Sequence, residues 1–156
     1  MFASLLLLAT VALADPPEIA HGKDFGVGVA VGLPPVAFTG KYWFDNDNGL
    51  AFYGATWPPN FFEARVQYDR RFVEFGDWDF GDVGMYFHVG VASRYFPVVN
   101  GTDYFVMGPS GGVGGLVRFK AVPAEAFAEM CTEVYAVGWS HGWGDIDMVA
   151  GGRWYF

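Results

Sequence analysis

The stretch FFEARVQYDRRF, residues 61–72, alternates apolar and polar side chains and decides the fold. Its apolar face consists of Phe62, Ala64, Val66, Tyr68 and Phe72, with Arg70 as the one interruption. Its polar face consists of Glu63, Arg65, Gln67, Asp69 and Arg71. Because successive side chains of a β-strand point to opposite sides, this pattern predicts a strand with one apolar and one charged face.

The same alternation recurs along most of the chain. It is clear again in residues 85–95 and weakest in residues 49–57, where both faces are mostly apolar. We expect eight strands, at residues 25–33, 36–44, 49–57, 61–72, 85–95, 112–119, 127–135 and 146–156. Pro, Gly, Asn and Asp mark the connections, at residues 34–35, 45–49, 58–60, 76–84, 97–109, 121–124 and 138–145. Short strands joined by such turns predict an all-β, eight-stranded antiparallel up-and-down barrel.

Residues 1–14 have the pattern of a signal peptide. They hold a short apolar core and end in the cleavage motif Ala12-Leu13-Ala14, although no Lys or Arg precedes the core. Position 15 is Asp rather than Cys, so we expect no lipidation. We therefore expect cleavage after Ala14 and one barrel domain over residues 15–156.

The overall composition narrows the class of protein. Hydrophobic residues make up 53% of the chain, yet no stretch after residue 14 approaches the roughly 18 consecutive apolar residues of a membrane helix. The net charge of −8 argues against a nucleic-acid partner, because phosphate binding needs a basic face. Cys131 is the only cysteine, which excludes an intramolecular disulfide and is typical of a small core residue.

An eight-stranded meander can close as a water-soluble or as a membrane barrel, and the two types turn the charged face in opposite directions. A charged face turned outward would leave many large apolar side chains for a narrow interior. Turned inward, it places both signs of charge in the lumen, where they can pair. These residues are Lys41, Glu63, Arg65, Asp69, Arg71, Arg94, Arg118, Glu129, Glu133 and Arg153. The Gly-rich faces of the first and sixth strands would leave room for the long Arg side chains.

Aromatic side chains near the strand ends support the membrane type. They would form girdles at the lipid interfaces and are Phe44, Trp57, Phe72, Tyr95, Trp154 and Phe156. We therefore predict a transmembrane barrel of the bacterial cell outer membrane, surrounded by outer-membrane lipid, with a closed and charge-paired lumen.

The chain ends in Trp154-Tyr155-Phe156, a terminal aromatic residue with apolar residues at alternate positions before it. This ending resembles the C-terminal signal that the barrel-assembly machinery recognises, with Trp154 and Phe156 as the signal residues. Nearly the whole mature chain is similar to the small eight-stranded outer-membrane barrels typified by the OmpA membrane domain and OmpX. It most resembles an uncharacterised bacterial family of such barrels, through Gly32-Leu33-Pro34, Lys41-Tyr42-Trp43 and the aromatic end. The resemblance implies no catalytic residue.

A lipid-modifying enzyme, such as a lipid A deacylase or acyltransferase, is the alternative function. Its candidate residues would be Ser140, His141 and Asp145. Adjacent residues of an extended chain point to opposite faces, and the H-x-S-N pattern of the deacylases is absent after His141. His88 has no second His or Cys at ligand spacing. We therefore expect no enzyme activity, no catalytic residue, no cofactor and no metal site.

The outward connections are the remaining candidates for a binding function. With both chain ends on the periplasmic side, the first, third, fifth and seventh connections face outward. The fifth and seventh carry large aromatic residues that favour contact surfaces: Tyr104, Phe105, Trp139 and Trp143. The same residue types also suit a lipid interface, so an extracellular protein ligand and a purely structural role both stay open. We expect a monomer in either case.

Overall fold

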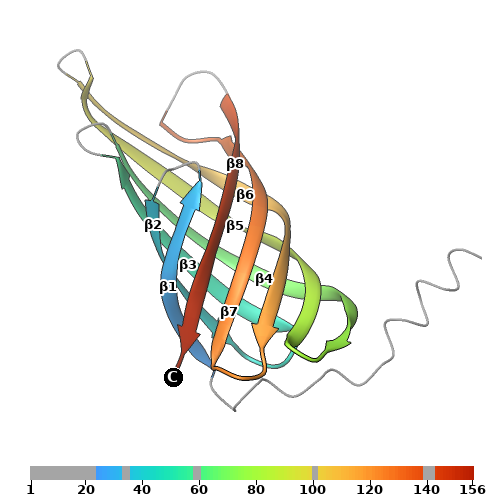
Figure 1. The fold of residues 1–156 in the computed structure, drawn as a ribbon. Helices are drawn as coiled ribbons and strands as arrows, with labels where there is room; N and C mark the ends of the chain where they lie inside the picture. Colours follow the sequence, from blue (N-terminus) through green and yellow to red (C-terminus); the bar gives the residue numbers. More distant parts are fainter. Residues whose placement is uncertain (1–23, 33–35, 58–60, 100–101, 139–142) are drawn as a thin grey trace, which may run out of the picture.

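Eight antiparallel strands close into one barrel (Figure 1). The computed structural model describes residues 24–32, 36–57, 61–99, 102–138 and 143–156, so the predicted signal peptide lies outside the described residues. The strands are β1 (Phe25–Gly32), β2 (Val36–Trp43), β3 (Asn48–Trp57), β4 (Phe61–Trp78), β5 (Gly81–Val99), β6 (Thr102–Phe119), β7 (Ala124–Tyr135) and β8 (Trp143–Tyr155). The predicted fold class is confirmed.

Each strand pairs with the next one in the chain, and β1 closes the barrel against β8. The two described chain ends lie together, since Trp43 N donates to Asp24 O at 2.8 Å and Phe156 N donates to Phe25 O at 2.9 Å. We call this end of the barrel the turn end; its connections are residues 44–47, 79–80 and 120–123 (Figure 1). We call the opposite end the loop end; its connections are residues 33–35, 58–60, 100–101 and 136–142.

Burial alternates along the strands, as a side-chain period of two requires. In β7 every second residue from Glu125 to Tyr135 is buried, and the register between β6 and β7 runs from Ser110 to Arg118 without a shift. In β4, Arg65 is buried while its neighbour Val66 is exposed. The lumen is consequently lined with polar side chains, and the outer surface is apolar.

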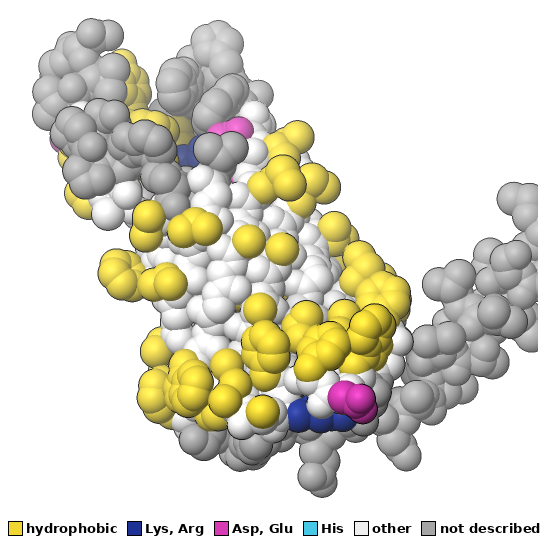
Figure 2. Space-filling view, viewed as in Figure 1, with side chains coloured by type: hydrophobic (Ala, Val, Ile, Leu, Met, Phe, Trp, Pro, Cys, Tyr) yellow, Lys and Arg dark blue, Asp and Glu magenta, His cyan; other side chains and the backbone are white. Residues whose placement is uncertain are grey.

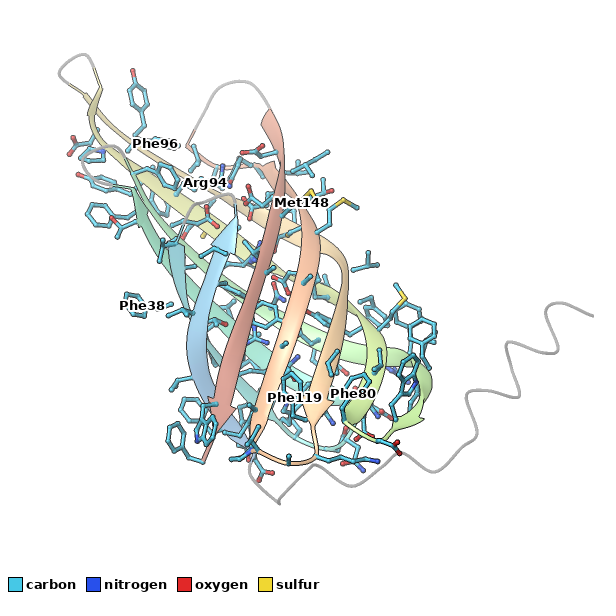
Figure 3. The ribbon with its side chains drawn as sticks, in the orientation of Figure 1. Phe38, Phe80, Arg94, Phe96, Phe119 and Met148 are labelled. Atoms are coloured by element: carbon cyan, nitrogen blue, oxygen red, sulfur yellow. The ribbon has the colours of Figure 1, made fainter. Side chains whose placement is uncertain are left out.

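The outer surface shows this apolar character directly. In the face drawn in Figure 2, groups of hydrophobic side chains lie along the barrel wall and gather toward its lower end, and charged side chains appear only near the two ends. Phe38 and Met148 point away from the barrel, whereas Arg94 lies within it near the loop end (Figure 3). Within the described residues, no helix has the length and apolar character needed to cross a membrane.

Three strands are longer than the sequence pattern predicts. Residues 76–84 and 97–109 were expected to be connections, but β4, β5 and β6 continue through most of them. The β4–β5 hairpin is irregular at this point. Gly76 has a φ of 123°, and the register of the two strands shifts between Glu74 and Gly76. Pro97 lies at the register shift that follows Phe96, and Pro109 lies just beyond the part of β6 that is in register with β7. Proline is tolerated at such places because no continuous ladder needs its N–H.

One glycine on the lumen face of β1 and one on that of β6 make room for tyrosine rings rather than for arginine side chains. A Cβ at Gly114 would lie 2.4 Å from the Tyr86 ring, and a Cβ at Gly26 would lie 2.8 Å from the Tyr155 ring. The expectation that these glycine faces accommodate Arg is therefore wrong at both positions. The rings replace the missing side chains in filling the narrow lumen.

Candidate functional site

The charged residues that alternation assigns to the inner face are all buried in the lumen. They are Lys41, Glu63, Arg65, Asp69, Arg71, Arg94, Arg118, Glu129, Glu133 and Arg153. A charge taken out of water is costly unless an opposite charge or hydrogen bonds compensate it, so the partners of these groups define the site.

Three further acids share the lumen, and the sequence pattern did not single them out. Asp82 lies in a stretch that was expected to be a connection, and Glu125 stands just after an expected turn. Asp147 is on the same face of β8 as Arg153, so alternation alone could have found it. With these three, the buried charged residues in the described part of the chain are seven acids and six bases. The lumen is thus close to charge balance.

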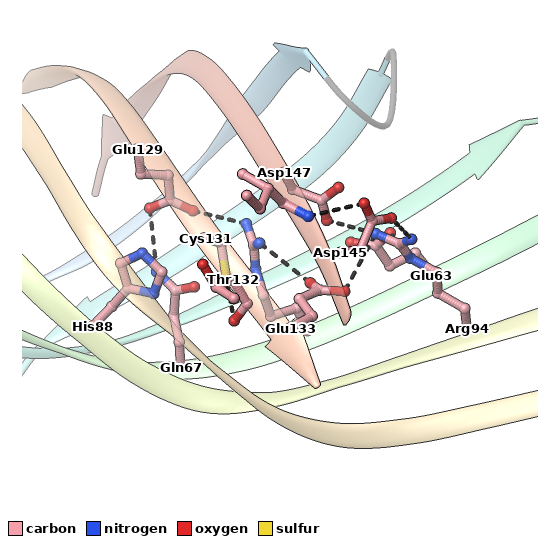
Figure 4. A network of polar contacts seen from close by, with 12 residues as sticks. Glu63, Gln67, His88, Arg94, Glu129, Cys131, Thr132, Glu133, Asp145 and Asp147 are labelled. Atoms are coloured by element: carbon pink, nitrogen blue, oxygen red, sulfur yellow. Dashed lines mark hydrogen bonds and ion pairs between the residues drawn. The ribbon is translucent and has the colours of Figure 1, made fainter. Parts of the chain in front are cut away.

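At the loop end, Arg94 is surrounded by four carboxylates (Figure 4). Its guanidinium nitrogens lie 2.8 Å from Glu63, 3.2 Å from Glu133, 2.6 Å from Asp145 and 2.6 Å from Asp147. These acids come from β4, β7 and β8, so Arg94 on β5 ties the walls together across the lumen.

The same cluster contains the only group of potential metal ligands found among the described residues. Oxygen atoms of Glu63, Glu133 and Asp147 lie within 4.8 Å of one another. The Arg94 guanidinium forms ion pairs with all three, so it supplies the positive charge that a cation would otherwise bring. His88 does not belong to this group; its Nε2 lies 3.3 Å from the carbonyl of Met130.

In the middle of the lumen, Glu129 on β7 collects donors from two other strands. Arg65 Nη2 and Tyr86 OH each donate to its carboxylate at 2.7 Å, and Gln67 Nε2 donates at 3.2 Å. Gln67 also donates to Asp69 at 2.9 Å, and the Lys41 ammonium lies 2.7 Å from Asp69. A continuous chain of polar contacts therefore runs from β2 through β4 to β7.

At the turn end, aromatic rings join the charged groups. The Arg153 guanidinium pairs with Glu125 at 2.8 Å and stacks on Phe127, 3.8 Å from the ring centroid. The Trp43 side chain, which alternation assigns to the polar face, is almost completely buried, and its indole N–H donates to Tyr155 OH at 3.0 Å. Arg71 lies at the rim, 3.5 Å from Asp47 and 3.7 Å from Glu74. The turn end is thus filled by rings and cations as well as by ion pairs.

The predicted girdle and assembly-signal residues lie on the outside of the barrel. Phe44, Phe72, Tyr95, Trp154 and Phe156 are exposed, whereas the Trp57 side chain lies outside the described residues. Phe156, at 65% exposure, follows the last residue of β8 next to β1. A role of Trp154 and Phe156 in assembly stays a prediction.

The structure describes the side chains of only two of the four predicted surface-contact residues. Tyr104 and Phe105 lie in β6 rather than in a loop, in register with Phe96 and Tyr95 of β5, so their expected location is corrected. Trp139 and the Trp143 side chain lie outside the described residues.

Of the three candidate residues for the enzyme alternative, the structure describes only Asp145. Ser140 and His141 lie outside the described residues, and Asp145 is held by Arg94.

The geometry defines a closed eight-stranded antiparallel barrel with a charged interior and an apolar exterior. The N-terminal β-barrel domain of Pseudomonas aeruginosa OprF has a similar structure, with a TM-score of 0.60 and 16% sequence identity, over 85% of this chain and 96% of that domain. At this identity the likeness establishes the fold, and the predicted resemblance to OmpA-type eight-stranded barrels is confirmed at that level. No family model and no curated protein sequence matches the chain.

Proposed function

We propose that this protein is an integral outer-membrane barrel with a closed, charge-paired lumen. The observation that carries the proposal is the inverted polarity of the barrel: among the described residues, thirteen charged ones are buried inside, while large apolar side chains lie on the outside. A soluble barrel would expose such a surface to water, whereas a lipid bilayer solvates it favourably. The similarity in fold to the OprF barrel domain supports the same conclusion.

Contacts between distant walls support a closed lumen. Arg65 on β4 reaches Glu129 on β7, and Arg94 on β5 reaches Asp147 on β8. An eight-stranded barrel has an interior just wide enough for its side chains, so these bridges leave no wide aqueous path. We infer a structural or surface-binding role rather than that of a general pore.

The binding role would fall to the loop end, where the β5–β6 hairpin extends beyond the neighbouring strands. Its pairs Phe96↔Tyr104 and Val99↔Thr102 lie beyond Tyr95, the last β5 residue paired with β4, and beyond Ser110, the last β6 residue paired with β7. Phe105 is about half exposed. A projecting hairpin with an exposed aromatic side chain offers a contact surface to an extracellular protein ligand.

Cell fractionation combined with a heat-shift gel tests the proposal. The mature protein should appear in the outer-membrane fraction, and unheated samples should migrate differently from boiled ones because the closed barrel resists detergent. Val89→Lys, at an exposed position on the β5 wall, should reduce the membrane-integrated form, since lysine at the bilayer midplane costs roughly 2–4 kcal/mol. Asp103→Lys at the loop end is the matched control and should assemble normally. A wild-type protein recovered in the soluble periplasmic fraction would refute the proposal.

A further inference from the structure

At the turn end of the lumen, the ring of Trp43 contacts two cations. The ring of Trp43 has the Lys41 ammonium 3.8 Å and the Arg118 guanidinium carbon 4.0 Å from its centroid. Trp43 belongs to β2 and Arg118 to β6, which are four positions apart in a ring of eight strands. The contact between them therefore joins opposite walls of the barrel.

The position of the ring is fixed from other sides as well. The indole N–H donates to Tyr155 OH, which in turn donates to Glu125 at 3.2 Å. Gly49 on the neighbouring strand leaves the space that the ring needs, because a Cβ there would lie 3.0 Å from it. Specific contacts therefore hold the Trp43 ring in its position in the lumen.

The two ends of the lumen are closed by different chemistry. At the loop end, Arg94 is held by four carboxylates, so that closure consists of ion pairs. At the turn end, the closing group is a ring with two cations against it. Lys41 also pairs with Asp69 at 2.7 Å and Arg118 lies 3.8 Å from Glu125, but the attraction between ring and cation itself needs no carboxylate. A change that breaks one closure therefore does not by itself break the other.

From this geometry we propose that Trp43, clamped by Lys41 and Arg118, is a seal that closes the turn end of the lumen independently of the Arg94 cluster at the loop end. The lumen then has two seals in series, with the polar contacts of Glu129 between them. This proposal rests on the membrane barrel proposed above and adds the location and the chemistry of its closure.

The single cysteine provides a native probe of the lumen between the two seals. Cys131 is buried on the lumen face of β7, between Glu129 and Glu133 (Figure 4). It lies two residues from Glu133, a ligand of Arg94, and six residues from Glu125 at the turn end, which is about 20 Å of strand. A thiol reagent therefore reaches Cys131 from the turn end only after passing the level of Trp43.

The experiment measures modification of Cys131 by a small, charged, membrane-impermeant methanethiosulfonate reagent. The purified barrel is reconstituted in liposomes in one known orientation, and the reagent is added to either side. Trp43→Ala should raise the rate of modification from the turn end by roughly tenfold or more, the factor that corresponds to the loss of one desolvated cation–π contact. The rate from the loop end should not change.

Matched variants distinguish the loss of the seal from a general loosening of the barrel. Trp78→Ala removes an exposed tryptophan at the end of β4 and should leave both rates at the wild-type level. Trp43→Phe keeps a ring between the cations and should retain most of the protection. If Trp43→Ala does not fold, Arg118→Gln replaces it as the test variant: the ring stays and one cation is lost, and a smaller rise from the turn end is expected.

The outcomes are decisive in either direction. An unchanged turn-end rate in a folded Trp43→Ala barrel, or equal rises from both ends, would overturn the two-seal proposal. A wild-type protein that does not insert into liposomes would instead refute the membrane barrel, and the seal would then be tested on the folded protein in detergent. Trp43→Ala must increase total modification of Cys131 there as well; an unchanged rate counts against the seal.

Discussion

Removal of the Glu129 carboxylate should destabilise the barrel severely. This group accepts hydrogen bonds from Arg65 and Tyr86 at 2.7 Å and from Gln67 at 3.2 Å, and its side chain is fully buried. In Glu129→Ala, the nearest remaining carboxylate to Arg65 is Glu133 at 3.6 Å, and the Tyr86 hydroxyl loses its acceptor. Breaking a buried ion pair costs about 3–5 kcal/mol, and an unsatisfied buried hydroxyl adds about 1–3 kcal/mol. We expect a loss of roughly 4–8 kcal/mol in the free energy of unfolding.

Urea unfolding in lipid vesicles, followed by tryptophan fluorescence and the heat-shift gel, measures this loss. Asp103→Ala is the control, because Asp103 also accepts a hydrogen bond, from Tyr95 at 2.8 Å, but does so on the exposed surface. The double variant Arg65→Met with Glu129→Leu removes both charges and should recover much of the stability, since an apolar pair replaces a buried ion pair at little cost. If Glu129→Ala unfolds at the same urea concentration as Asp103→Ala, the lumen charges do not contribute as we reason.

Three further predictions concern assembly, packing and binding. Deletion of Phe156, or Phe156→Asp, should reduce barrel assembly and leave protease-sensitive precursor, whereas Phe62→Ala should only weaken the fold; normal assembly of both terminal variants would exclude an assembly signal. Gly114→Val should lower the urea midpoint by the equivalent of about 1–3 kcal/mol, because its side chain meets the Tyr86 ring, and it should cost less in a Tyr86→Ala background; an equal cost in both backgrounds would contradict this packing. Replacing the four aromatics Tyr104, Phe105, Trp139 and Trp143 with Ser should keep assembly intact and abolish capture of any extracellular protein ligand, and unchanged capture in a pull-down would move the binding surface elsewhere.

Alternation predicts the strands well because the pleat of a β-strand gives its side chains a period of two residues, independent of the neighbouring strands. The burial of Arg65 beside exposed Val66 follows from this local rule. The ends of β4, β5 and β6 did not follow, because Gly76, Pro97 and Pro109 were interpreted as turn signals. Bulges and unpaired positions tolerate these residues, and only the pairing with neighbouring strands shows where such positions fall.

The partners inside the lumen depend on how the barrel closes. Alternation assigns Trp43 and Arg118 to the inner face, but their contact exists only because β2 and β6 stand opposite each other in the closed ring. In the same way, Arg94 meets Glu133 and Asp147 across the lumen because of the stagger between strands, whereas Glu63 is its direct partner in the β4–β5 register. The sequence pattern predicts which residues share the lumen, whereas the stagger decides which of them touch.

Spin-label accessibility tests the central claim, an apolar wall in contact with lipid, most directly. In a Cys131→Ser background, labels at Val29 and Val89 on the barrel wall and at Asp103 on the loop end are compared in proteoliposomes. We expect the Val29 and Val89 labels to collide frequently with oxygen, which concentrates in lipid, and rarely with a water-soluble nickel complex. The Asp103 label should show the reverse. Wall labels that are as accessible to nickel as the Asp103 label would contradict this claim.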